Sequence, residues 1–409
     1  MYKILVSKNQ HYSCQRCGRC CKRFNVRIEP YEIERLKKLD WGDEPHPEDF
    51  YETINGFYYF KRKADGGCVF LDDNGVCRIH AKFGFDVKAL TCRGYPMNII
   101  STAPDELSVL ARMDCPAVLA NNGEPLVNQQ RDIMQLVSEM KFGSGFDDGE
   151  RAGLNRQTID FICREFHRVV RDTQLDIPRR MLWIYSLISQ LTRLGTVFVN
   201  DLETLKTVWM NLLRKGATTA HNAPDGTPLT AFQRLLFRSW LSFYCRRDEE
   251  NVHRTIGTRV NNFTNNYKFI MGSGSWHRMG FEHPDISSRQ AGLFSSHLEN
   301  RGDEAEWKPY LDFLVNRLDT LQFFGAAYYN VNFYKGLHAL LLTYPLVLAV
   351  AKVHAAASGR RVLHHGDVFN ATMAIDHAHG RSPALNTFTA RYYEGFFAPT
   401  RFLSLVNSF

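Results

Sequence analysis

The sequence predicts a mainly α-helical protein in which a small cysteine-rich, metal-binding domain precedes a larger all-helical domain. Eight of the ten cysteines lie within the first 115 residues. Beyond about residue 150, apolar residues recur at intervals of three and four, and strand-like alternation is almost absent. The length of 409 residues is enough for two or three domains. We therefore expect a cysteine-rich domain over residues 1–120, a linker region over 121–150 and a helical domain over 151–409.

The N-terminal domain is expected to combine loops, one helix and short strands. Pro30 suits the first turn of a helix, and Ile33, Leu36 and Leu39 then follow on one face. The aromatic run at 57–60, Phe-Tyr-Tyr-Phe, is typical of a short strand.

The helical domain is expected to follow a flexible joint. Residues 142–149, Phe-Gly-Ser-Gly-Phe-Asp-Asp-Gly, have the composition of such a joint, so we place the domain boundary between about 120 and 150. Asp201 can cap one helix, which Gly216 is expected to end. The predicted helices cover residues 159–169, 181–191, 202–212, 232–244, 311–321 and 331–353.

The charge balance is mildly basic, with a formal net charge of +7. In the first forty residues ten Lys and Arg stand against four Asp and Glu. These bases suit the surroundings of a negatively charged thiolate–metal centre, and a solvated basic face is the alternative. We expect no clear nucleic-acid groove, because the basic run lacks interleaved aromatic residues.

No segment indicates export or a membrane span. Residues 1–10 lack the apolar run of a secretory signal. The apolar run at 337–351 is interrupted by His338, Thr343 and Pro345, which favours a buried helix. We therefore expect a cytoplasmic protein without membrane partners, whose thiols bind metal in preference to forming disulfides.

The cysteine spacing is the main functional signal. Four thiols occur in Cys14-Gln-Arg-Cys17-Gly-Arg-Cys20-Cys21, and thiolates this crowded repel one another unless a metal or a covalent bond takes up their charge. The turn at 73–75, Asp-Asn-Gly, is expected to bring two further cysteines together. The predicted metal ligands are Cys14, Cys17, Cys20, Cys21, Cys68, Cys77, Cys92 and Cys115.

The number of thiols leaves several types of centre open. Adjacent side chains diverge, so Cys20 and Cys21 are not expected to bind the same tetrahedral ion. Eight thiols suit either two four-ligand sites or one polynuclear cluster with spare thiols. A CxxCxxC loop can wrap a 4Fe–4S cluster, which we favour over zinc, and redox disulfides are the third choice. His80 can replace one thiolate, although a surface or core role is expected for it.

Three segments resemble one known family. The series CQRCGRCC (14–21), CVFLDDNGVCRIH (68–80) and TCRGYP (91–96) is similar in order, spacing and flanking residues to the CxxCxxCC zinc- or iron-chelating family, also called the YkgJ-type cysteine-cluster family. The resemblance covers roughly the first 120 residues. It implies a metal-binding function for this segment.

The longer relatives in that group are flagellin lysine N-methylases. The segment 310–317, Tyr-Leu-Asp-Phe-Leu-Val-Asn-Arg, followed by Phe323 and Phe324, resembles a tyrosine–asparagine helix of those enzymes. This resemblance implies an iron–sulfur cluster, S-adenosylmethionine as methyl donor and a lysine-bearing, flagellin-like protein substrate. It makes Tyr310, Asn316 and Arg317 candidate cofactor-binding residues and identifies no catalytic base.

Two other classes of function stay open. One is an iron–sulfur oxidoreductase or electron-transfer protein, and the other is a protein-interaction module stapled by zinc. The chain contains no GxSxG or HExxH motif and no Walker-type loop. The aromatic stretch 323–334 forms either a pocket for a sulfonium or alkylammonium group or part of the core.

Overall fold

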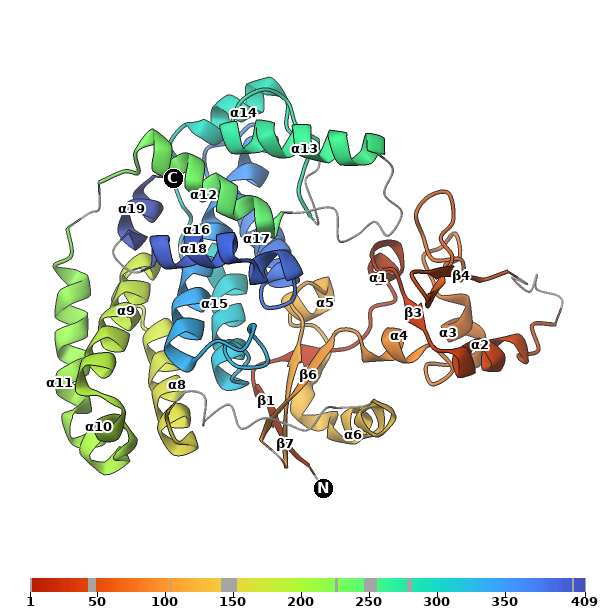
Figure 1. Cartoon of the computed structure of the whole chain (residues 1–409), viewed down its shortest axis with the longest axis horizontal. Coiled ribbons are helices and arrows are strands. Elements are labelled where there is room, and N and C mark those ends of the chain that lie inside the picture. Colours follow the sequence, from red (N-terminus) through yellow and green to blue (C-terminus); the bar gives the residue numbers. More distant parts are fainter. Residues whose placement is uncertain are drawn as a thin grey trace.

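The computed structural model describes residues 2–42, 49–103, 105–140, 153–224, 227–245, 256–277, 282–398 and 401–408. It confirms the predicted mainly helical class, with short strands confined to the N-terminal third (Figure 1). The cysteine-rich segment and the large group of helices lie on opposite sides of a small sheet in this view. The sheet therefore connects the two parts of the molecule.

The N-terminal third contains short elements joined by turns. They are β1 (Lys3–Val6), β2 (His11–Tyr12), α1 (Arg19–Arg23), β3 (Arg27–Ile28), α2 (Pro30–Lys37), β4 (Tyr51–Ile54), β5 (Phe57–Phe60), α3 (Arg78–Phe83), α4 (Leu90–Gly94), β6 (Met97–Ala103), β7 (Glu106–Ala111), α5 (Pro116–Leu119), β8 (Glu124–Pro125), the 3-10 helix η1 (Leu126–Asn128) and α6 (Gln130–Glu139). Both local predictions are confirmed: α2 begins at Pro30, and residues 57–60 form β5. A capping box between Glu29 and Glu32 stabilises the start of α2.

The cysteine-rich segment has a hydrophobic cluster of its own. Helix α2 and the sheet β3-β5-β4 enclose aromatic side chains, of which Trp41 and Phe70 stack at 5.7 Å between ring centroids. Phe50 and Phe60 complete the centre of this cluster. Packing of this kind supplies folding energy that does not depend on metal.

The connecting sheet has the order β1-β7-β6, with β1 parallel and β6 antiparallel to β7. One contact with the helices is the hydrogen bond from Ser108 Oγ to the backbone carbonyl of Thr320, at 2.5 Å. On another side, Leu107 and Val109 pack with Ile133 and Val137 of α6. The sheet is thus held by both α6 and the helical part.

The helical part extends over the rest of the described chain. Its elements are α8 (Arg156–Val170), α9 (Ile177–Leu194), α10 (Thr196–Asn200), α11 (Leu202–His221), α12 (Ala231–Tyr244), α13 (Ile256–Met271), α14 (Ser288–Ser295), α15 (Glu304–Asp319), α16 (Phe333–Ala357), α17 (His365–Ala378), the 3-10 helix η2 (Pro383–Asn386), α18 (Phe388–Phe397) and α19 (Phe402–Asn407). Every helix predicted from apolar periodicity is present. Asp201 caps α11 as expected, because its side chain accepts a hydrogen bond from the backbone N–H of Thr204.

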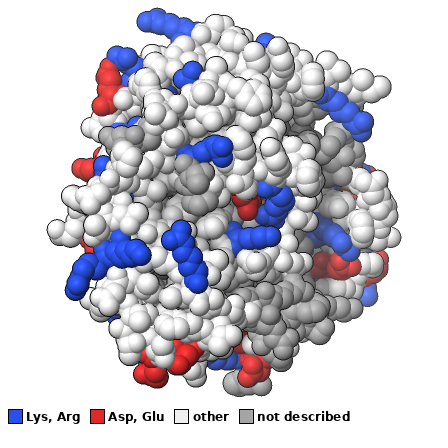
Figure 2. Space-filling view, turned by 60° about the vertical axis from the view of Figure 1, so that its left-hand side comes forward, with Lys and Arg blue, Asp and Glu red and all other residues white. Residues whose placement is uncertain are grey.

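The charged side chains are spread over the surface that Figure 2 displays. On that face Lys and Arg side chains stand apart on largely uncharged surface and form no continuous basic patch.

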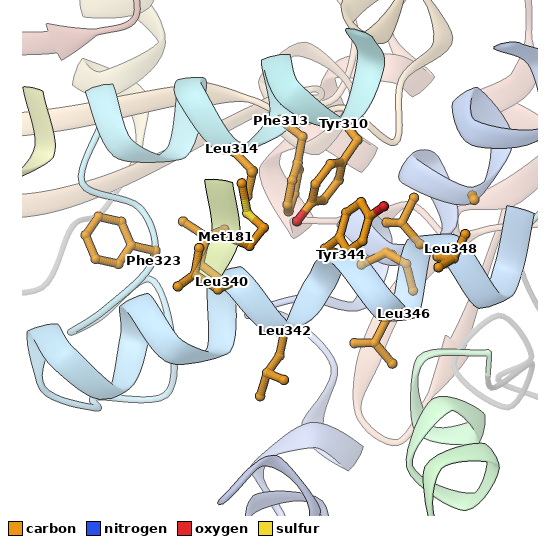
Figure 3. Close-up of a cluster of buried hydrophobic side chains, with 14 of the residues drawn as sticks. Met181, Tyr310, Phe313, Leu314, Phe323, Leu340, Leu342, Tyr344, Leu346 and Leu348 are labelled. Carbon is orange, nitrogen blue, oxygen red and sulfur yellow. The ribbon is translucent and has the colours of Figure 1, made fainter. Parts of the chain in front are cut away.

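Helix α16 forms the centre of the helical core. By length and composition it could cross a membrane, but 94% of its most apolar window is buried inside the protein, as in the core helix that the sequence predicted. Figure 3 shows its side chain Tyr344 beside Tyr310 of α15, and Leu340 beside Met181 of α9. The interrupting polar groups are accommodated within the core, where Thr343 and Tyr310 share a hydrogen bond of 3.1 Å.

The prediction that Gly216 ends a helix is wrong, because α11 continues to His221. Gly216 faces Trp183 of α9, and an added Cβ would lie 2.7 Å from the indole Cδ1. The indole is held in place, since its N–H donates to the carbonyl oxygen of Leu213 at 3.0 Å. The glycine permits close packing between α9 and α11, which local sequence does not reveal.

Gly216→Ala is therefore expected to destabilise the protein by about 1–3 kcal/mol, because the overpacking cost exceeds the helix propensity gained. The matched control is Gly292→Ala in α14, where nothing lies within 4 Å of the added Cβ. That substitution is expected to be neutral or stabilising by up to about 1 kcal/mol. Urea unfolding followed by circular dichroism measures both, and an equal effect of the two would contradict the packing explanation.

The predicted joint at 142–149 lies outside the described residues. Residues 121–140, the earlier part of the predicted linker region, form β8, η1 and α6. The large hydrophobic cluster of the helical part also includes Cys115 and Leu126. The partition into 1–120, 121–150 and 151–409 stays a prediction.

Candidate metal centre

The first four cysteines lie on a loop and on the short helix α1 that follows it. Cys14 and Cys17 are exposed, whereas Cys20 and Cys21 are half-buried. Gly18 precedes α1 with φ of +66°, a left-handed conformation that glycine adopts without strain. Gly18 is therefore the N-cap residue that joins the loop to α1, which carries the paired cysteines.

The paired thiols do not diverge as the sequence argument expected. The Sγ atoms of Cys20 and Cys21 are 3.9 Å apart. Two thiolates on one tetrahedral zinc, with Zn–S bonds of about 2.3 Å, are separated by about 3.8 Å. The pair can therefore share one ion, and this spacing alone does not favour a cluster over zinc.

The second arm of cysteines is joined to the first by backbone contacts. Cys68 donates its backbone N–H to the carbonyl oxygen of Cys21 at 2.9 Å. The following turn returns the chain through Cys77, and Asp72 accepts a hydrogen bond from the backbone N–H of Val76 at 2.7 Å. This turn lies against the first loop, since a Cβ on Gly18 would be 2.7 Å from the carbonyl oxygen of Gly75.

The third arm supplies Cys92 from α4, and Cys115 precedes α5. The eight N-terminal cysteines then converge on two adjoining cavities. One, of about 60 Å³, is lined by Cys14, Cys17, Cys20, Cys21, Cys77, Cys92 and Cys115. The other, of about 360 Å³, is lined by Cys20, Cys21, Cys68, Cys77 and Cys92. Four cysteines are common to both cavities, so the structure gathers all eight predicted ligands in one region.

Burial makes these thiols poor acids in the absence of a cation. It raises the pKa of Cys68 and that of Cys115 to about 11. The neighbouring Cys21 and burial together raise the pKa of Cys20 well above its ordinary value. Lys88 lines both cavities. Burial lowers its pKa, but Cys92 and the other thiols raise it by more, so the pKa of Lys88 lies above its ordinary value. The site therefore favours a soft cation that stabilises thiolates.

The donor set fits zinc or iron. Thiolates are the ligands of structural zinc and of iron–sulfur clusters, and all eight N-terminal cysteines are unbridged. In the described part of the chain, no three side chains of His, Cys, Asp or Glu are already gathered around a single point. The thiols that share the two cavities are the candidate ligands. His80 lines the smaller cavity, and burial lowers its pKa.

The other two cysteines are separate from this region. Cys163 lies in α8 and Cys245 follows α12, and both are buried among apolar side chains of the helical part. Burial raises the pKa of each thiol. They are the core residues that the helical pattern predicted.

A buried carboxylate beside Cys115 was missed by the sequence argument. Asp114 forms ion pairs with Arg112 and, at 3.6 Å, with Arg23. Its oxygens also contact Tyr95 Oη at 3.3 Å and His377 Nδ1 at 3.1 Å. Burial opposes its charge, yet Arg112, His377 and Arg23 hold the pKa of Asp114 well below its ordinary value. The carboxylate thus stays ionised next to the cysteine cavity.

This carboxylate leads to a second one in the helical part. The backbone N–H of Asp114 donates to Asp376 Oδ2 at 3.2 Å. Asp376 pairs with Arg317 at 2.6 Å and with Arg381 at 3.0 Å. A hydrogen-bonded path therefore connects the residue before Cys115 with α15 and α17.

The predicted cofactor-binding residues are all buried in this helical part. Tyr310 shares its hydrogen bond with Thr343, and Asn316 accepts one from Ser7 Oγ at 2.7 Å. Arg317 is bound by Asp376. Their side chains contact other protein groups in the core and do not line the two cysteine cavities, and their binding of a cofactor stays a prediction.

Gly18→Ala is expected to reduce metal content severalfold, because the added Cβ would clash with the Gly75 carbonyl and separate the first two cysteine arms. Gly56→Ala is the matched control. Gly56 also has a positive φ, of +82°, but nothing lies within 4 Å of the added Cβ. Both variants carry the cost of a left-handed alanine, about 1–2 kcal/mol. Metal analysis of the purified proteins should show the loss only for Gly18→Ala, and equal losses would contradict the proposed contact.

Comparison with known proteins places the cysteine-rich segment in a metal-chelating class. Residues 13–116 match the family model CxxCxxCC, described as "Putative zinc- or iron-chelating domain". The match spans the same cysteines that line the two cavities. The chain therefore carries a metal-binding cysteine cluster of the CxxCxxCC type, for zinc or iron.

A similar individual protein occurs in an archaeon. The chain is 24% identical over 202 residues to "Uncharacterized protein MJ0939" of Methanocaldococcus jannaschii, in an alignment that covers 49% of this chain and 69% of that protein. No solved structure matches the chain significantly. The family match supports metal binding, and none of the comparisons assigns a reaction.

Proposed function

We propose that the two cysteine-lined cavities hold an iron–sulfur cluster, of the 4Fe–4S type, and that the protein is an enzyme of the flagellin lysine N-methylase type. The single observation that carries the metal assignment is the convergence of all eight N-terminal cysteines on adjoining cavities. The cysteines that belong to the helical core lie elsewhere.

Iron–sulfur is preferred to zinc because of the space beside the shared cysteines. One zinc ion and one 4Fe–4S cluster each require four thiolates, so the number of thiols alone does not distinguish them. The larger cavity, of about 360 Å³, adjoins the shared cysteines and offers room for inorganic sulfide. When bound, such a cluster supplies a redox-active, negatively charged centre. Arg16, Arg19 and Lys88 line the smaller cavity and would offset that charge.

The methylase assignment is supported by two resemblances. Segment 14–96 is similar to the CxxCxxCC family, whose longer relatives are these enzymes, and segment 310–324 is similar to one of their helices. In the proposed reaction a substrate lysine loses its proton and its amine attacks the methyl carbon of S-adenosylmethionine. The carbon–sulfur bond breaks, and S-adenosylhomocysteine leaves. The amine must be neutral before attack, which requires a nearby base or a desolvating pocket. Tyr310, Asn316 and Arg317 are the proposed cofactor contacts, and a flagellin-like protein in the cytoplasm is the proposed substrate.

The metal proposal is tested by elemental analysis of protein purified without oxygen. Iron together with a matching amount of acid-labile sulfide, and absorbance near ~400 nm, is the expected result. A result of two zinc ions per chain and no sulfide would reject the iron–sulfur cluster and show that the thiols bind zinc.

The methylase proposal is tested separately by calorimetry with S-adenosylmethionine. We expect saturable binding and methylation of a lysine-bearing protein substrate. No detectable heat at millimolar ligand would reject methyl transfer while leaving the metal assignment intact.

One other function has a specific observation in its favour. The basic side chains at the smaller cavity would stabilise the more reduced, more negative state of a cluster, as in an electron-transfer protein. A reversible redox couple without S-adenosylmethionine binding would favour this function. Bound zinc, with neither a redox couple nor S-adenosylmethionine binding, would favour a protein-interaction module.

A further inference from the structure

A second cavity lies in the helical part and has no residue in common with the cysteine cavities. Its volume is about 390 Å³, and residues of α12, α13, α14 and α16 line it. Four of the lining side chains are basic: Arg234, Arg238, His297 and Lys352. Among the lining residues that the structure describes, none is Asp or Glu.

The cations at this cavity are partly or fully withdrawn from water. Lys352 is only 3% exposed, on the central helix α16. Burial and the nearby Arg238 lower the pKa of Lys352 to about 7. Burial and Arg234 lower the pKa of Arg238 to about 10. Each charged form is therefore destabilised by its surroundings, and a bound anion would relieve that cost.

The two most buried cations are oriented by the same aromatic ring. The guanidinium of Arg238 lies 4.9 Å from the ring centroid of Phe294, and Lys352 Nζ lies 5.9 Å from it. Gly272 makes room for the arginine, since an added Cβ there would lie 1.8 Å from Arg238 Nη1. Arg238 Nη2 also contacts Ser295 Oγ at 3.5 Å. The cations are thus positioned before any ligand arrives.

We propose that this cavity is a binding site for a small phosphate-bearing anion. A phosphate monoester carries close to two negative charges at neutral pH, which matches the buried Lys352 and the half-buried Arg238 better than a monocarboxylate does. Arginine binds phosphate oxygens through paired N–H groups, and lysine adds a compact charge. A volume of about 390 Å³ is within the range of small-ligand sites, about 300–1,000 Å³. This proposal does not rest on the metal or methylase proposals.

Calorimetry with inorganic phosphate, at constant ionic strength, tests the site in the full-length protein. Saturable binding is expected, and Arg238→Gln or Lys352→Met should weaken it by about tenfold or more, since each removes a charge-assisted contact. Lys206→Gln is the control. Lys206 lies exposed on α11, paired with Glu203, and its loss should leave phosphate binding unchanged. No binding at about 10 mM phosphate, or equal binding by all variants, would overturn the proposal.

Chemical labelling of the unmodified sequence guards against variants that fail to fold. Pyridoxal 5′-phosphate carries an aldehyde and a phosphate; its aldehyde condenses with a neutral amine, releasing water, and borohydride then reduces the imine to a stable secondary amine. Peptide mapping should find Lys352 labelled severalfold more by this reagent than by pyridoxal, which lacks the phosphate, and inorganic phosphate should protect it. Equal labelling by both reagents, or no protection, would reject an anion site at Lys352.

Discussion

Replacing Cys20 by serine is expected to remove most of the bound metal. Cys20 lines both cysteine cavities, so its thiolate is placed to serve whichever type of centre occupies them. A serine hydroxyl is a harder and much weaker ligand for zinc or iron than a thiolate. The test is to measure iron, zinc and acid-labile sulfide per chain in the variant purified without oxygen.

Cys163→Ser is the matched control, because it makes the same atomic change in the helical core. Its metal content should equal that of the original protein, although the buried hydroxyl is expected to lower its free energy of unfolding. The N-terminal aromatic cluster should keep much of the secondary structure of Cys20→Ser intact, so circular dichroism can separate metal loss from unfolding. Equal metal loss in the two variants would contradict the division of the ten cysteines.

Asp376→Asn is expected to lower the free energy of unfolding by about 3–5 kcal/mol. The carboxylate is 1% exposed and pairs with Arg317, which is 2% exposed, and with Arg381. An amide retains the shape but leaves the buried guanidinium of Arg317 and the half-buried guanidinium of Arg381 without their counter-charge. Urea or thermal unfolding followed by circular dichroism measures the loss.

Glu203→Gln provides the comparison on the surface. Glu203 makes the same type of ion pair with Lys206, but its side chain is 83% exposed. Loss of this ion pair should lower the free energy of unfolding by at most about 0.5 kcal/mol, because water and salt screen exposed pairs. A loss for Asp376→Asn as small as this would show that the buried pair contributes little to stability.

The helices could be predicted because their burial follows from local periodicity. The apolar faces around Ile159 and Met181, and the cap at Asp201, correspond to α8, α9 and α11. Gly216 misled the prediction because its role depends on Trp183, which belongs to another helix. A glycine that ends a helix and one that admits a neighbouring side chain look the same in a single sequence.

The metal region could be recognised only in part. The crowding of Cys14 to Cys21 is local, and the short turn before Cys77 is local as well. The carboxylates Asp114 and Asp376 are separated by 262 positions, and no pattern within one segment connects them. Arg317, a charged residue on a largely apolar helix, is the local sign that a buried counter-charge lies nearby. Its observed partner is Asp376.

The contact between Asp114 and Asp376 links metal loading to the unfolding equilibrium of the distant helices. Because a ligand that binds only the folded state stabilises it by mass action, loading the thiols should raise the melting temperature of α15 and α17 as well as that of the cysteine-rich segment. Conversely, substitutions that loosen those helices should make the protein release its metal to a chelator more readily, without touching a single cysteine.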